Sequence, residues 1–306
     1  MKQQPVLTYL VPLICILAVI AAGAGLLWQA AGTPYTFTTL HGETVEIAGQ
    51  GLYSYDTVFT AATLRGTDIV TLFVGVPLLA ISFGMYRRGS LRGGILMTGV
   101  LAFILYYGTS LGLATAYNTL FLVYLALFSA SFFAFVLAFT AIDLQTLPDR
   151  ISPRLPRRGM AVFMIIAGLG TGFIWLSDAV SALIANQAPA ALGPYTTVVT
   201  YVLDVGIIAV AALLAGILLL RRAPLGYLLT AVLTIMLALV GVMVVFQTVM
   251  QLSAGIQLSN GELFGKVGTW LIMGGIAIGF TVVFLRSIRE SGGDLPVKAQ
   301  ASAVSD

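Results

Sequence analysis

The chain has 306 residues, of which 59% are hydrophobic and only 9% are charged, and its formal net charge is +3. A soluble domain carries roughly 25% charged residues, so this composition excludes an ordinary water-soluble fold and predicts a protein that folds in a lipid bilayer. We interpret the positive charge as a signal of membrane topology, and we expect no nucleic-acid partner.

The hydrophobic runs predict an all-α, polytopic membrane protein with about eight transmembrane helices. A hydrocarbon layer of ~30 Å requires about 20 residues of apolar helix, at a rise of ~1.5 Å per residue. Runs of this length recur along the whole chain. We expect helices at residues 8–30, 68–86, 93–115, 119–142, 159–184, 198–220, 224–251 and 265–286.

The first hydrophobic run has some features of a signal peptide. It follows Lys2 and ends in small residues near positions 21–25. However, Gly25-Leu-Leu-Trp28 near its end has a counterpart in Gly172-Phe-Ile-Trp175, within the fifth predicted helix. Because the first run matches a later helix, we expect it to be retained as a helix.

A short segment between the first two predicted helices has the pattern of a β-hairpin. Tyr35-Thr-Phe-Thr-Thr-Leu40 and Glu43-Thr-Val-Glu-Ile47 are rich in β-branched and aromatic residues, and the turn-like pair His41-Gly42 lies between them. We therefore expect a small extracytoplasmic β-hairpin within about residues 33–66.

The chain contains a sequence pattern that occurs twice. Asp68 is followed, about one membrane crossing later, by Arg87-Arg88, and Asp204 is followed by Arg221-Arg222. This predicts two four-helix units, and because four crossings is an even number, the units would be parallel repeats about an axis along the membrane normal. Chance similarity among apolar helices is the alternative. The predicted units are residues 1–142 and 159–290, joined by a cytoplasmic linker at 143–158 and followed by a disordered cytoplasmic tail at 291–306.

The distribution of basic residues predicts the orientation. Cytoplasmic flanks of membrane helices retain Lys and Arg, and with eight crossings only Arg65 and Lys266 fall on the other side. We therefore expect both termini in the cytoplasm. The basic residues on the predicted cytoplasmic side are Lys2, Arg87, Arg88, Arg92, Arg150, Arg154, Arg157, Arg158, Arg221, Arg222, Arg286, Arg289 and Lys298.

Several chemistries lack the residues that they need. The single histidine, His41, lies in the predicted hairpin turn, so bis-histidine haem ligation, a His-rich zinc site and a His-based catalytic dyad within the membrane are excluded. The single cysteine, Cys15, lies within an apolar helix, where it is more often a small hydrophobe than a nucleophile. The sequence has no glycine-rich phosphate loop and no nucleophile elbow. We expect no cofactor, no metal and no catalytic residue.

Three aspartates near the predicted outer edge of the hydrocarbon are candidates for function: Asp68, Asp178 and Asp204. Asp68 follows Gly66-Thr67 at the start of a predicted helix, where a carboxylate can serve as an ordinary helix cap. Asp204 would lie one or two turns inside its helix, where a carboxylate needs a partner. Helix-end chemistry is therefore the alternative to a ligand-binding role, most of all for Asp68.

In the ligand-binding interpretation, the aspartates join other polar residues in an outward-facing cavity. Asp68 and Asp204 would face one another across it, with tyrosines on its wall, and a cationic or hydroxylated ligand would suit it. An interfacial aromatic belt is the alternative explanation for the tyrosines. The other expected ligand-binding residues are Tyr106, Tyr107, Thr109, Tyr117, Asn118, Gln247 and Gln251.

These features leave three classes of function open. The first is binding or transport of a small molecule or lipid through the outward-facing polar cavity. The second is a non-enzymatic structural or regulatory role, in which the hairpin and the basic loops contact a membrane protein partner or anionic lipids of the bilayer. The third and weakest is a lipid-modifying enzyme with paired outer carboxylates, for which the sequence has neither a metal site nor an activated nucleophile.

Parts of the chain resemble a known family. Gly51-Leu-Tyr-Ser-Tyr-Asp56, Asp68-Ile-Val-Thr-Leu72 and Arg87-Arg-Gly-Ser-Leu-Arg-Gly93 resemble segments of a family of uncharacterised polytopic membrane proteins of bacteria. Leu120-Phe-Leu-Val-Tyr-Leu-Ala-Leu-Phe128 and Arg221-Arg-Ala-Pro-Leu-Gly-Tyr-Leu-Leu229 are similar to the same family. The resemblance supports the topology and implies a bacterial inner (plasma) membrane location. It brings no activity, cofactor or ligand.

Overall fold

The protein is a helical bundle with one small β-hairpin. The structure, a computed structural model, describes residues 3–189 and 191–290, so the predicted disordered tail at 291–306 lies outside the described residues. Within this part of the chain, eight helical spans are long and apolar enough to cross a membrane, which confirms the expected number and suggests a multi-pass membrane protein. The spans are α1 (Leu7–Leu27), α2 (Val58–Val70) to α3 (Val76–Arg87), α4 (Leu91–Leu113), α5 (Phe121–Thr140), α6 (Arg157–Ile184), η3 (Tyr201–Ala209) to α7 (Val210–Leu220), α8 (Pro224–Ser253) and η4 (Glu262–Val267) to α9 (Gly268–Ser287).

The second span starts earlier than the sequence predicts. α2 (Val58–Val70) begins after Thr57, whose side-chain oxygen accepts a hydrogen bond from the Thr60 amide at 3.1 Å. Asp68 therefore lies about ten residues, or ~15 Å, inside the helix, and its interpretation as a helix cap is wrong. The predicted hairpin region of 33–66 is also too long, because its last part is helical. Arg65 and Asp68 interrupt the apolar run, but the helix continues through them.

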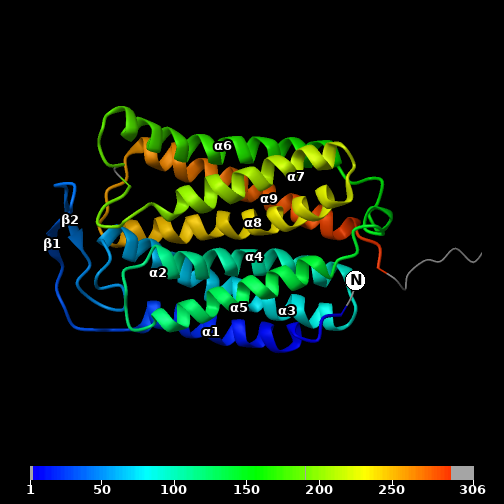
Figure 1. The fold of residues 1–306 in the computed structure, drawn as a ribbon, viewed down its shortest axis with the longest axis horizontal. Helices are drawn as coiled ribbons and strands as arrows, with labels where there is room; N and C mark the ends of the chain where they lie inside the picture. The colour runs from blue at the N-terminus through cyan, green and yellow to red at the C-terminus, as the bar shows by residue number, and fades with distance from the viewer. Residues whose placement is uncertain (1–2, 190, 291–306) are drawn as a thin grey trace, which may run out of the picture.

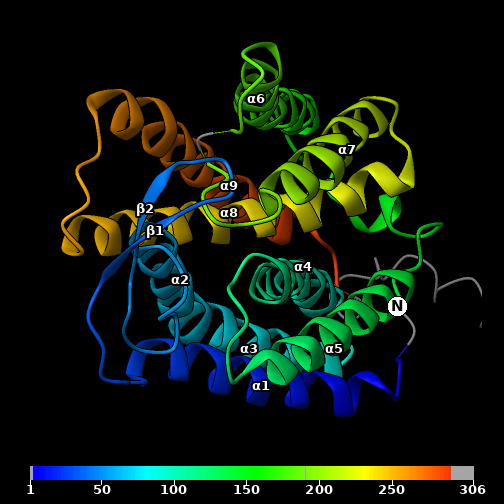
Figure 2. The same ribbon diagram turned by 60° about the vertical axis from the view of Figure 1, so that its left-hand side comes forward.

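The predicted hairpin is confirmed in its two strands. β1 (Tyr35–Thr38) pairs antiparallel with β2 (Thr44–Ile47), with Tyr35 opposite Ile47 and Thr38 opposite Thr44. Gly42 has a positive φ of 82°, a conformation that the connecting turn requires and that glycine adopts without strain. Figure 2 shows the hairpin at one end of the bundle, in front of α2 and α8.

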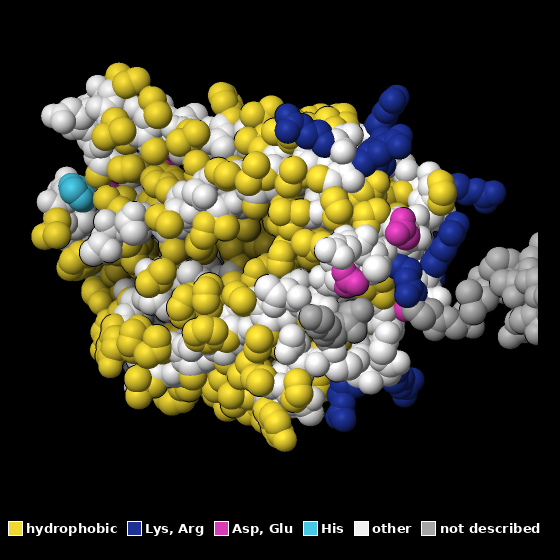
Figure 3. All heavy atoms as spheres, turned by 45° about the vertical axis from the view of Figure 1, so that its right-hand side comes forward, with side chains coloured by type: hydrophobic (Ala, Val, Ile, Leu, Met, Phe, Trp, Pro, Cys, Tyr) yellow, Lys and Arg dark blue, Asp and Glu magenta, His cyan; other side chains and the backbone are white. Residues whose placement is uncertain are grey.

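The helices form two groups that lie one above the other in Figure 1. α1, α2, α3, α4 and α5 pack together in one group, and α6 packs on α7, α7 on α8 and α8 on α9 in the other. Both ends of the described chain lie at the end of the bundle opposite the hairpin. On the face that Figure 3 shows, the Lys and Arg side chains gather at this same end.

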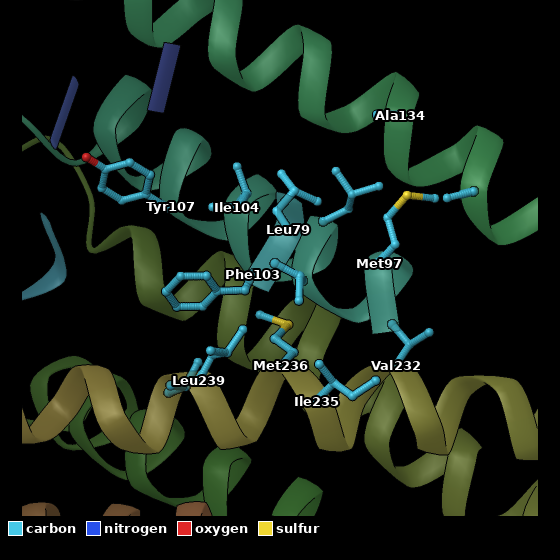
Figure 4. Close-up of a cluster of buried hydrophobic side chains, with 14 of the residues drawn as sticks. Leu79, Met97, Phe103, Ile104, Tyr107, Ala134, Val232, Ile235, Met236 and Leu239 are labelled. Carbon is cyan, nitrogen blue, oxygen red and sulfur yellow. The ribbon is translucent and has the colours of Figure 1, made fainter. Parts of the chain in front are cut away.

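The two groups meet on α8, which packs against α2 and α4 as well as against α7 and α9. Figure 4 shows Phe103 of α4 close to Met236 and Leu239 of α8, with Ile235 next to Met236 and with Ile104 of α4 farther from α8. All five side chains are buried. This continuous apolar layer joins the groups into one core.

Glycines let α8 approach its neighbours at two crossings. A Cβ on Gly66 of α2 would lie 2.4 Å from the backbone of Gln247, and a Cβ on Gly241 would lie 2.5 Å from the Cα of Gly274 in α9. Small residues at helix crossings allow the backbones to pack closely, which is a main source of attraction between helices in a bilayer.

The last described residues close the end of the bundle opposite the hairpin. The Glu290 carboxylate accepts hydrogen bonds from the amides of Leu91 (2.9 Å) and Arg92 (3.0 Å) at the start of α4. Ile288 forms an antiparallel bridge with Ile151 in the segment between α5 and α6. The end of α9 is thus attached to both groups of helices.

We expect Gly274→Ala to destabilise the protein and the adjacent Gly275→Ala to be tolerated. A methyl group at position 274 would overlap the Gly241 backbone and cost about 1–3 kcal/mol. At position 275 nothing lies within 4 Å of the new carbon, so the free energy of unfolding should stay equal or rise by up to about 1 kcal/mol. Unfolding of both variants in one detergent measures the difference, and equal stability would contradict the close crossing.

Candidate functional site

The centre of the candidate site is Asp68, a carboxylate that is completely buried about ten residues from the start of the second span. The hydroxyl of Tyr53 donates a hydrogen bond to its Oδ2 at 2.8 Å, and the hydroxyl of Tyr107 donates to its Oδ1 at 2.6 Å. Arg65 lies within electrostatic range of the carboxylate. An ionisable group at this depth is costly and usually marks a functional position.

Three separate segments enclose this carboxylate. Tyr53 comes from the loop between β2 and α2, and Tyr107 comes from α4. On the third side, α1 contributes Gly25, where an added Cβ would lie 1.9 Å from the Asp68 Oδ2. Only glycine leaves room for the carboxylate at this point of α1.

Tyr53 is kept in its donor form by its surroundings. Burial raises the pKa of the Tyr53 hydroxyl well above its usual range, and the negative charge of Asp68 raises it further. The hydroxyl therefore stays protonated and donates to the carboxylate.

The helix that carries Asp68 changes its hydrogen-bonding pattern directly after it. Thr71–Gly75 form a π-helical turn, η1, between α2 and α3 (Val76–Arg87). Asp204 lies inside a second such segment, η3 (Tyr201–Ala209). π-helical turns are rare and occur frequently at functional sites, so both candidate carboxylates lie in or beside irregular helix.

Next to Asp68, three buried polar atoms form no hydrogen bond of ordinary geometry with the described protein atoms: Asp56 Oδ2, Asn118 Nδ2 and the Tyr124 hydroxyl, the last of which is still close enough to Asn118 and Tyr53 to interact with them. Tyr124 lies within range of Asn118, Tyr53 and both carboxylates, so these atoms belong to one cluster. The set combines an acceptor, a donor and a group that can do both. Unpaired buried polar atoms are uncommon in native proteins and require an explanation.

Asp56 links this cluster to the other group of helices. Its Oδ1 accepts hydrogen bonds from the Ala116 amide at 2.9 Å and from the Tyr195 hydroxyl at 2.8 Å. Tyr195 lies in the connection between α6 and η3. Burial raises the pKa of Asp56 from 3.8 to about 6, although both hydrogen bonds act to lower it.

Asp204, which is also buried, has its own aromatic partners. The indole Nε1 of Trp175 donates to Asp204 Oδ2 at 2.9 Å, and the half-buried Tyr106 of α4 interacts with the same carboxylate. The Tyr201 hydroxyl donates to Asp178, and the rings of Trp175 and Tyr201 meet edge to face with their centroids 5.9 Å apart. This second cluster thus connects α6, η3 and α4.

The two aspartates approach α4 from different sides. The consecutive residues Tyr106 and Tyr107 contact Asp204 and Asp68 respectively. Because successive side chains on a helix point about 100° apart, the two carboxylates contact different faces of α4. The expectation that Asp68 and Asp204 face one another across a cavity stays a prediction, and the adjacent tyrosines of α4 link the two carboxylates.

The structure brings some of the other expected residues to the site and leaves one outside. Gln247 of α8 donates to Thr67, next to Asp68, at 2.8 Å, and Gln251 donates to Thr63 at 2.7 Å. Tyr117 is 76% exposed and packs on Phe121, away from the buried cluster. Thr109, the remaining member of the expected set, donates to the carbonyl of Leu105 within its own helix.

Sequence reasoning missed Tyr53, Asp56, Tyr124, Trp175 and Tyr195 as site residues. Tyr53, Asp56 and Tyr195 come from connections between helices, whose paths no helical periodicity predicts. Trp175 carried a usable signal, since an indole N–H in a membrane helix needs an acceptor.

In the described part of the chain, no group of three or more His, Cys, Asp and Glu side chains is placed to hold a metal ion. The clusters therefore offer hydroxyl, indole, amide and carboxylate groups for hydrogen bonding. None of the family models, curated proteins or solved structures compared with this chain matches it.

We expect Tyr107→Phe to weaken the protein and Tyr117→Phe to leave it unchanged. The first substitution removes a hydroxyl that bonds a fully buried carboxylate, which should cost about 1–3 kcal/mol. The second removes a hydroxyl from an exposed ring. Thermal unfolding of the two variants tests this, and equal melting temperatures would contradict the role of the Tyr107 bond.

Asp56 should make stability depend on pH. Its pKa in the folded protein is raised from 3.8 to about 6, so the folded state binds more protons than the unfolded state between these values. The free energy of unfolding should therefore fall as the pH rises from about 4 to 6, by up to about 3 kcal/mol. Above pH 6, Asp56 should cause no further change in stability. Asp56→Asn keeps an acceptor for Tyr195 and should remove this fall.

The control is Glu43→Gln, which changes an exposed carboxyl at the same end of the molecule. Denaturant unfolding of the three proteins between pH 4 and 7 measures the effect. If Asp56→Asn and wild type have parallel pH profiles, burial does not raise the pKa of Asp56.

Proposed function

We propose that this protein binds and transports a small hydroxylated or cationic molecule, or the polar part of a lipid, at the cluster around Asp68. The protein would reside in a bacterial inner membrane with both termini in the cytoplasm. The basic residues at one end of the bundle support this orientation, since positive charge is retained on the cytoplasmic side. The hairpin end, with Asp68 nearer to it, would then face outward.

The observation that carries the proposal is the set of unpaired buried atoms beside Asp68. Asp56 Oδ2 can only accept a hydrogen bond when ionised, Asn118 Nδ2 can only donate, and the Tyr124 hydroxyl can do both. A small ligand with hydroxyl or amine groups would satisfy all three. A site that orients a small molecule typically has a small number of polar groups within a mostly apolar lining.

In this proposal the structure corresponds to a closed state. The loop that carries Tyr53 covers Asp68 from the outer end, and both carboxylate oxygens are occupied by tyrosine hydroxyls. A ligand hydroxyl or ammonium group would replace one tyrosine as donor when the loop opens. The π-helical turn η1, next to Asp68, would supply the local change in helix geometry.

We propose that transport occurs by alternating access, in which two four-helix units, arranged as parallel repeats, move against one another. An aspartate in or beside a π-helical turn, followed by an arginine pair, is present in α2 to α3 and in η3 to α7. Repeats of this kind are common in transporters, where one unit moves against the other around a central site. α4 and α8, the third helices of the two units, would form the surface on which they move.

A second candidate function is a structural or regulatory role with a membrane protein partner. The hairpin supports it, because Tyr35 and Phe37 are about half exposed and Leu40 at the turn is fully exposed. Exposed aromatic and aliphatic side chains of this kind are typical of contact surfaces.

Native mass spectrometry of the protein purified in native lipid tests the proposal. We expect a bound small mass in the wild type and at least a tenfold loss of its occupancy in Asp68→Asn/Asp204→Asn and in Tyr124→Phe, equivalent to about 1.4 kcal/mol of binding. Asp143→Asn, at an exposed position of the opposite end, is the control and should keep the ligand.

Equal occupancy in all four proteins would contradict a binding role for the cluster. Crosslinking from the hairpin then tests the second candidate. Recovery of a partner that Leu40→Ser releases would favour the structural or regulatory role.

A further inference from the structure

The end of the bundle opposite the Asp68 cluster contains a separate cavity of about 520 Å³. Its walls come from the connection between α5 and α6, the first turn of α6, the turn between α7 and α8, and the first turn of α8. A cavity of this volume is within the usual range for small-molecule sites. It has no residue in common with the site described above.

The cavity is strongly basic. Three arginines line it, Arg157, Arg158 and Arg222, together with Tyr227, and no aspartate or glutamate is among its lining residues. Arg157 Nη1 is buried and has no hydrogen-bond partner within the described protein atoms. A buried guanidinium N–H without an acceptor carries a large desolvation cost, which an anionic ligand would offset.

The backbone at Arg222 is strained in a way that a ligand would explain. Arg222 follows α7 with a positive φ of 59°, and it is one of two non-glycine residues among those described with this conformation. Its amide bonds the carbonyl of Leu219, and the next amide bonds that of Leu218, as at a helix end where glycine is preferred. An arginine at a glycine position points to a use for its side chain.

Apart from Ser152, the rest of the cavity wall is apolar. Ile151, Leu155 and three prolines line it beside the arginines. Gly159, in the first turn of α6, leaves the wall open, because the nearest atom to an added Cβ there would be in the Phe280 ring at 3.9 Å. The cavity therefore matches a ligand with a charged group on one side and an uncharged, partly apolar body on the other.

We propose that this cavity binds a phosphate ester. Arginine guanidinium groups match phosphate oxygens in geometry and charge, and the tyrosine hydroxyl adds a further donor. The ester is either the headgroup of an anionic phospholipid, which basic pockets between membrane helices bind at the inner leaflet, or a soluble phosphate compound. In both cases Arg157, Arg158 and Arg222 would bind the phosphate group.

The test uses the full chain in nanodiscs of phosphatidylcholine with one tenth phosphatidylglycerol by number, on the order of ten anionic lipids per protein. Native mass spectrometry after lipid removal counts the lipids that stay bound. We expect wild type to retain phosphatidylglycerol at least tenfold over phosphatidylcholine, and Arg222→Gly and Arg157→Gln to lose this preference. Arg88→Gln removes an exposed charge at the same end outside the cavity and should retain it.

Arg222→Gly separates binding from folding. Glycine removes the backbone strain at this position, so its melting temperature in pure phosphatidylcholine should equal or exceed that of wild type. If Arg157→Gln lowers the melting temperature, Arg158→Gln, at an exposed position, replaces it in the comparison.

A second arm identifies the source of the phosphate. Inorganic phosphate and glycerol 3-phosphate are added to the protein in pure phosphatidylcholine, and melting temperatures are measured. A rise that Arg222→Gly abolishes assigns a soluble phosphate, whereas lipid preference without such a rise assigns a headgroup. If wild type shows neither response, or if Arg88→Gln loses as much as the cavity variants, the proposal is wrong.

Discussion

The fold of this protein at the hairpin end of the bundle depends on the burial of one carboxylate. Asp68 has no exposed surface, so each of its oxygens needs a donor, and tyrosine hydroxyls supply both. This requirement determines its neighbourhood: α1 has a glycine beside it, the loop after β2 places Tyr53 over it, and α4 presents Tyr107. A set of polar bonds, and not apolar packing alone, therefore holds the loop, α2 and α4 together beside Gly25 of α1. In an apolar environment water does not compete for these hydrogen bonds, so they specify one arrangement of the segments that they join.

The two ends of the bundle are chemically different. The end near the hairpin combines carboxylates, tyrosines, an amide and an indole within buried clusters, and α4 connects the two carboxylates through adjacent tyrosines. The opposite end holds most of the arginines and the basic cavity between α6, α7 and α8. In the function proposed above, the outer clusters bind the transported molecule and the basic end contacts anionic phosphate. α8 packs against both groups of helices and so joins them along the bundle.

The comparison of predicted and observed helices shows where sequence patterns are sufficient to locate a helical span. Seven of the eight described spans begin within about three residues of their predicted starts, because long apolar runs leave few alternatives in a bilayer. The second span differs because Arg65 and Asp68 made its first turns look like loop. The sequence has no sign that Asp68 is bonded by Tyr53 and Tyr107, since those residues lie in another loop and another helix. A buried polar residue is compatible with a helix only when distant partners exist, and these are unknown until the chain is folded.

The sequence by itself determined the class of structure: an apolar, polytopic helical chain with about eight spans, a short hairpin and a strong charge asymmetry between the ends. These properties follow from composition and periodicity, which act locally along the chain. It also identified Asp68, Asp204, Tyr106, Tyr107 and Gln247 as candidates by residue type. Only the tertiary structure decided which of them meet, that adjacent tyrosines of α4 contact the two aspartates, and that Asp56, Tyr124 and Tyr195 belong to the same region. The reason is physical: hydrogen bonds between residues far apart in sequence depend on how helices and loops pack, and no local pattern records that packing.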